Sequence, residues 1–84
     1  MRGEDIPDDV AALLAEISAF DGLTLQGKFK TRIYRAGKPF LHFHWGDEGT
    51  VADVRYSHHF ERFPADTKAQ QRKLVSDVKK FLAG

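Results

Sequence analysis

The sequence of 84 residues contains no cysteine, and this absence limits how the protein can be stabilised. Neither a disulfide framework nor a zinc site with thiolate ligands can form, and a cysteine nucleophile is excluded as well. A domain of this size buries only about 60–65% of the surface that its unfolded chain exposes. We therefore expect one hydrophobic core to hold residues 1–84 together as a single domain, unless an oligomer contributes.

Long hydrophobic runs are also missing. No apolar stretch approaches the roughly 18 residues that a membrane-spanning helix needs. The first twenty residues begin with acidic rather than basic side chains, which argues against a secretory signal peptide. We expect a cytoplasmic protein with no membrane partner.

Catalytic and nucleotide-binding motifs are absent too. The glycines match no phosphate-binding or dinucleotide fingerprint, and they lie where turns or bends are needed. The serines and threonines do not lie in a nucleophile elbow. We expect no cofactor, and the sequence favours binding over catalysis without deciding whether any reaction takes place.

Charge is sorted along the chain, although the net charge is only +1. Residues 1–22 carry a net charge of −5, and the remainder carries +6. A basic body with an acidic first helix fits three interpretations: contact with a polyanion, a self-complementary dimer, or ordinary solvated faces. The charge pattern alone does not choose among them.

Helical periodicity is strongest at the two ends of the chain. A helix is predicted over about residues 7–21, because Pro7 suits a first helical turn and apolar residues follow at helical spacing. A second helix is predicted over about residues 65–83. The apolar stripes that would face the core are Val10, Leu13, Leu14, Ile17 and Phe20 in the first helix and Leu74, Val75, Val78, Phe81 and Leu82 in the second.

The middle of the chain shows the alternation that is typical of half-buried strands. Strands are predicted over about residues 23–35, 40–46 and 50–57, with a bulge, bend or tight turn at Gly27-Lys28 in the first. Residues 57–64 have no clear period, so we expect a connection there, although a fourth strand is left open. The predicted fold class is α+β: an antiparallel three- to four-stranded sheet with the N- and C-terminal helices packed on one face.

Two helices on one side would leave the other face of the sheet exposed. Alternation places Leu41, Phe43 and Trp45 on the core side, so that the residues between them point outward. The ligand-binding candidates on the exposed face are Lys30, Arg32, Tyr34, Phe40, His42, His44, Asp53 and Arg55. A basic surface with a carboxylate, two imidazoles and aromatic rings could bind an anion, a metal ion or a second protomer.

His42 and His44 lie on the same face of one predicted strand, about 6.5–7 Å apart at the backbone, so both rings can reach one ion. A four-residue loop to the next strand places His42 opposite Asp53, whereas a two-residue loop of Glu48-Gly49 places His44 there. Either register predicts a metal site of His42, His44 and Asp53, suited to zinc, iron or nickel. His58 or His59 is a candidate further ligand.

The same residues carry a partial resemblance to a known family. The segment 37–46, with its glycines at both ends and its His42-x-His44 pair, followed by Asp53 and an aliphatic residue, resembles the small bacterial domains catalogued as luciferase-like. The resemblance covers about residues 14–56 and departs afterwards, because that family usually ends in a further strand. It implies no reaction, and it marks His42, His44 and Asp53 as the positions of interest.

A resemblance in topology concerns nucleic acid. The order α-β-β-β-α resembles that of the double-stranded RNA-binding domain, and the last predicted helix carries several basic residues. That family has a lysine cluster at the start of its last helix, where this chain has Asp66 and Thr67. Binding of nucleic acid or another polyanion is therefore kept as an alternative without being favoured.

Taken together, these features predict a small binding or protein-interaction module whose site is the exposed sheet face. A homodimer could form through this face, with Tyr34, Phe40 and Val51 as apolar contacts. Metal-ion binding through His42, His44 and Asp53 is the first alternative, and non-specific polyanion binding is the second. The sequence does not identify a partner.

Overall fold

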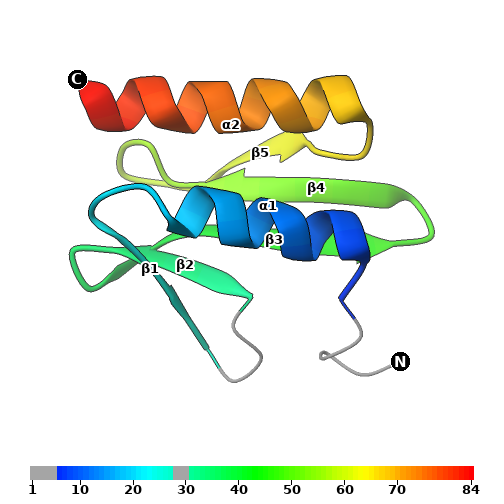
Figure 1. Ribbon diagram of the computed structural model, residues 1–84, viewed down its shortest axis with the longest axis horizontal. Coiled ribbons are helices and arrows are strands. Elements are labelled where there is room, and N and C mark those ends of the chain that lie inside the picture. Colours follow the sequence, from blue (N-terminus) through cyan, green and yellow to red (C-terminus); the bar gives the residue numbers. More distant parts are fainter. Residues whose placement is uncertain (1–5, 28–30) are drawn as a thin grey trace.

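A computed structural model describes residues 6–27 and 31–84. Its elements follow one another as a helix, a run of antiparallel strands and a second helix (Figure 1). They are α1 (Asp8–Ser18), β1 (Leu23–Gln26), β2 (Arg32–Arg35), β3 (Lys38–Gly46), β4 (Gly49–Val54), β5 (Glu61–Pro64) and α2 (Lys68–Ala83). The strands of this described part form one five-stranded sheet in chain order, and each pairs antiparallel with its neighbour. The predicted α+β class is confirmed, with more strands than expected.

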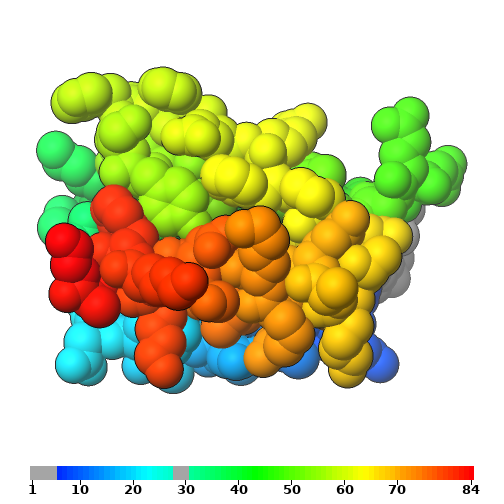
Figure 2. Space-filling view, turned by 90° about the horizontal axis from the view of Figure 1, so that it is seen from above, coloured from blue at the N-terminus to red at the C-terminus, as the bar shows by residue number. Residues whose placement is uncertain are grey.

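The two helices cover one face of the sheet. Helix α1 contacts β1 and β2, while α2 contacts β5 and α1 (Figure 1). Figure 2 shows α2 lying between α1 and the segment that contains β5. The core between the helices and the sheet is built from Val10, Leu13, Leu14, Ile17, Leu23, Ile33, Phe40, Leu41, Phe43, Ala52, Val54, Ala65, Leu74, Val75 and Val78. The opposite face of the sheet, which we call the open sheet face, carries no helix of the described residues.

The strand predicted over residues 23–35 is two strands. β1 and β2 form a hairpin in which Leu25 pairs with Ile33 and Gln26 pairs with Arg32. Gly27 has a φ of +102°, which a side chain would disfavour, so the chain can leave β1 there. The chain reverses direction between Gln26 and Arg32, so the two halves of the predicted strand run antiparallel. Lys28 and Lys30 lie outside the described residues.

The ends of the other elements also differ from the predictions. Residues 61–64, expected to be a connection, form β5 at the edge of the sheet. Helix α2 begins at Lys68 rather than at residue 65, because the Thr67 side chain accepts from the Gln70 backbone N–H at 3.2 Å and caps the helix there. Helix α1 ends at Ser18, earlier than the predicted residue 21.

Phe40 was expected on the open sheet face and lies in the core instead. Tyr34 pairs with Pro39 and Ile33 pairs with Leu41, so the register shifts and Phe40 is the extra residue of a β-bulge. The bulge turns both Phe40 and Leu41 toward the helices, where each is at most 2% exposed. The Phe40 ring stacks on Phe81 at 5.9 Å between centroids. Phe40 is therefore not available for ligand or dimer contacts.

Neither α1 nor α2 combines the length and the apolar character that crossing a membrane requires.

Candidate functional site

A row of polar side chains crosses the whole open sheet face. The antiparallel registers place one residue of each strand side by side: Gln26, Arg32, His42, Asp53 and Arg62. His42 lies opposite Asp53, which is the first of the two predicted registers. The pairing continues to Gly46 and Gly49, so that only Asp47 and Glu48 remain between the strands.

Asp53 is the centre of this row. Its side chain is 12% exposed, and its Oδ2 atom lies 3.3 Å from Nε2 of His42 and 3.2 Å from Nε2 of His44. The two imidazole rings are in contact with each other, with centroids 4.8 Å apart and nearly perpendicular planes. The structure thus brings together the three residues that the sequence predicted as a metal site.

Arg62 completes the cluster, and the sequence pattern does not reveal it. Its Nε donates to Oδ1 of Asp53 at 2.9 Å, and its Nη2 donates to Oδ2 at 3.1 Å. This guanidinium is the main reason that the pKa of Asp53 lies below its ordinary value, while burial opposes the effect in part. Because the segment containing β5 was expected to be a connection, no register placed Arg62 beside Asp53.

The electrostatics favour a neutral His42. Burial lowers the pKa of His42 most, and the neighbouring His44 and Arg32 lower it further, against the opposing effect of Asp53. A neutral imidazole keeps one ring nitrogen with a free lone pair, which is the form that binds metal ions. The cluster therefore offers an imidazole and a carboxylate that are both in the protonation state a cation requires.

The two separations between Asp53 and the histidines match a small coordination sphere. Zinc is usually bound tetrahedrally at about 2.0–2.2 Å, which puts neighbouring ligand atoms about 3.3–3.6 Å apart. The two distances from Oδ2 of Asp53 to the histidine nitrogens are 3.3 and 3.2 Å. All three ligand atoms lie within 4.8 Å of one another, and among residues 6–27 and 31–84 no other group of this kind is found.

The remaining predicted site residues have mixed outcomes. Arg32 is exposed and belongs to the row. Tyr34, two residues further along β2, is half-buried. Arg55 donates from Nε to the carbonyl oxygen of Pro39 at 3.1 Å and does not join the Asp53 cluster. His58 and His59, the candidate further ligands, are exposed and lie outside the metal-ligating group. Phe40 is buried, as described above, and Lys30 lies outside the described residues.

Phe60 is a second neighbour that sequence reasoning missed. Its side chain is the exposed large hydrophobic group of the described chain at 39% exposure. The ring packs against that of His42 with centroids 5.1 Å apart, and the Arg55 guanidinium lies 6.0 Å from its centroid. Phe60 thus shields one side of His42 from water while leaving His44 accessible.

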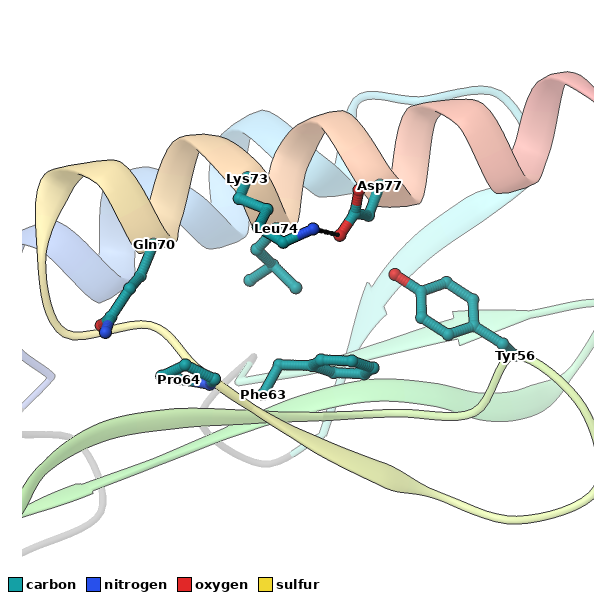
Figure 3. Close-up of a pocket in the computed structure, with 7 residues that line it drawn as sticks. All are labelled: Tyr56, Phe63, Pro64, Gln70, Lys73, Leu74 and Asp77. Carbon is teal, nitrogen blue, oxygen red and sulfur yellow. Dashed lines mark hydrogen bonds and ion pairs between the residues drawn. The ribbon is translucent and has the colours of Figure 1, made fainter.

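A separate shallow hollow lies between α2 and β5, away from this cluster (Figure 3). Its lining is mostly apolar, from Phe63, Pro64 and Leu74, and the Lys73–Asp77 ion pair of 3.1 Å closes part of its rim. The Tyr56 hydroxyl points into it, and burial together with Asp77 raises the pKa of Tyr56 to about 12. This hollow presents a neutral phenol and contains none of the predicted site residues.

The chain was compared with protein-family models, curated proteins and solved structures, and none of them matches it. The luciferase-like resemblance of residues 14–56 therefore stays a prediction.

Proposed function

We propose that this protein is a small binding module whose ligand is a divalent transition-metal ion, held on the open sheet face by His42, His44 and Asp53. The observation that carries the proposal is the position of the Asp53 Oδ2 atom, 3.3 and 3.2 Å from the two histidine Nε2 atoms. Both histidines face the same carboxylate oxygen, so one ion can reach all three groups.

The donor set supports an ion of the zinc, nickel or cobalt class. Two imidazoles and one carboxylate suit these ions, whereas magnesium and calcium prefer oxygen ligands only. Three protein ligands leave at least one coordination position open, as in sites that bind a further molecule on the metal. His44 is 54% exposed, so the site can be reached from solvent.

Calorimetric titration of the tag-free protein with zinc tests this proposal. One zinc ion per chain should bind to the wild type, and His42→Ala should weaken binding by about 10-fold or more, because a ligand is lost. His58→Ala is the matched control, since His58 is an exposed histidine outside the cluster. Binding that survives His42→Ala unchanged, or that disappears with His58→Ala, would contradict the assignment.

A second candidate function is anion binding at a different place. A groove beside the β2–β3 turn and the segment 55–60 is lined by Arg35, Lys38 and Arg55, and no carboxylate is among its lining residues in the described chain. His58 and the exposed Phe60 ring complete this groove. Cations beside an exposed aromatic ring suit a phosphate-bearing single strand.

Fluorescence anisotropy with a short oligothymidylate tests this candidate. Affinity should fall steeply as salt rises, and Lys38→Gln should weaken binding while Lys79→Gln, an exposed lysine on α2, should not. Equal losses from the two substitutions would show that only the overall charge matters and would remove the groove as a site.

A further inference from the structure

We propose that Arg62 occupies in the metal-free protein the place that the metal ion takes, so that the guanidinium and the ion exclude each other. Arg62 is then the residue that sets the affinity of the site. This inference rests on the proposed function, and it deepens it by adding the regulation of the same site.

The Asp53 carboxylate is already surrounded by nitrogen atoms. Arg62 binds both of its oxygens, at 2.9 Å to Oδ1 and 3.1 Å to Oδ2. His42 and His44 approach the same Oδ2 atom at 3.3 and 3.2 Å. An ionised carboxylate offers about two acceptor positions on each oxygen, so Oδ2 has more neighbours than it can satisfy well. A metal ion on Oδ2 therefore competes with the Arg62 guanidinium for this carboxylate.

Charge strengthens the exclusion. A guanidinium is always protonated near neutral pH, so Arg62 and a divalent cation on the same carboxylate would repel each other. Arg32, on the other side of His42 in the row, adds a second positive charge. Asp53 is the acidic side chain within the row, and it cannot compensate both cations at once.

Arg62 is free to leave. Its side chain is 63% exposed, and β5 is a four-residue strand at the edge of the sheet (Figure 1). The guanidinium can therefore turn into solvent without disturbing the core. The backbone pairing of Asp53 with Arg62 can persist while the side-chain contact is lost.

The exchange gives Arg62 two effects of opposite sign. Without metal, the two-pronged contact ties β5 to β4 and stabilises the fold. With metal, the same side chain competes for the ligand. Arg62→Gln should therefore lower the melting temperature of the metal-free protein and raise its affinity for zinc.

Arg72→Gln is a matched control. Arg72 makes the same kind of two-pronged contact, to Glu16 at 2.6 and 3.2 Å, and both partners are partly exposed. This pair joins α2 to α1, on the other side of the sheet from Asp53. It should lower stability in the same way as Arg62→Gln but leave zinc affinity unchanged.

Zinc calorimetry and thermal unfolding of the wild type, Arg62→Gln and Arg72→Gln test the exchange. We expect about 10-fold tighter zinc binding for Arg62→Gln only, within the usual range of coupling between two ligands. Arg62→Lys keeps the positive charge but cannot make the two-pronged contact. Its affinity for zinc should therefore fall between those of Arg62→Gln and the wild type.

The two possible failures are distinguishable. If Arg62→Gln binds zinc no more tightly than the wild type while His42→Ala still abolishes binding, the exchange is wrong and the metal site stands. If none of the variants nor the wild type binds zinc, the proposed function and the exchange are both wrong.

Discussion

At the scale of single residues, Phe40 is where the alternation rule failed. A period of two puts Phe40 on the side of His42, but one extra residue in β3 reverses its direction. Nothing in the local sequence marks this bulge, because both faces of the strand carry aromatic residues. The bulge is instead favoured by the ring cluster of Phe40, Tyr56 and Phe81 that it makes possible.

Phe40→Ala should destabilise the protein by about 3–5 kcal/mol, because it removes a fully buried ring from a small core. Urea unfolding measures this loss. Phe60→Ala is the control, since the Phe60 side chain is 39% exposed, and it should cost about 1 kcal/mol or less. Equal losses for the two variants would contradict the placement of Phe40.

Ala36 holds an unusual conformation in the turn between β2 and β3. Its φ is 54° and that of Gly37 is 77°, and two positive angles define the hairpin turn in which Asn-Gly is preferred. Ala36→Asn should stabilise the protein by up to about 1 kcal/mol, because asparagine tolerates this region better. A lower urea midpoint for this variant would show that the turn has a different geometry.

At the scale of elements, the two helices were predictable and the shortest strands were not. The apolar residues of α1 and α2 recur at helical spacing over several turns. Both helices can therefore be predicted even when their ends are misplaced by a few residues. β5 has only four residues, of which Phe63 is partly buried, and such a segment shows no clear alternation. Because β5 was not predicted, the contact between Arg62 and Asp53 was not predicted either.

The start of α2 gives a test at this scale. Thr67 and Gln70 form a capping box, in which each side chain binds the backbone of the other. Thr67→Ala should cost about 1 kcal/mol, as loss of an N-cap usually does. Ser76→Ala, an exposed change on the same helix, should stay within about 0.5 kcal/mol in the same urea unfolding experiment.

The packing of α2 on the sheet should also make stability fall at alkaline pH. The folded pKa of Tyr56 is raised to about 12, above its value near 10 in an unfolded chain. A raised pKa contributes stability that is complete below pH 10 and is lost as the pH rises toward 12. Tyr56→Phe should therefore lose less stability than the wild type between about pH 10 and 12 in urea unfolding. Parallel pH curves would show that Tyr56 does not contribute.

At the scale of the whole molecule, the three metal-ligand candidates were predictable because both registers considered placed Asp53 beside a histidine. The structure selects the register with His42 opposite Asp53, and the pleat then brings His44 within reach as well. The competing guanidinium could not be predicted, since it depends on the pairing of a strand that the sequence did not reveal. The contact between the Phe60 and His42 rings could not be predicted either.

The homodimer interpretation changes at this scale too. Its leading apolar contact, Phe40, belongs to the core, so the open sheet face offers fewer apolar groups than the sequence suggested. What this face offers instead is a charged row centred on Asp53. The arrangement of the whole sheet therefore supports a small ionic ligand more than a second protomer.

The most direct test of the metal proposal is a ¹H–¹⁵N correlation titration of the tag-free protein with zinc. We expect the largest shifts at His42, His44 and Asp53, with smaller ones at Arg62 as its side chain is released. Shifts confined to His58 and His59, or none at all under saturating zinc, would contradict a metal site on the open sheet face.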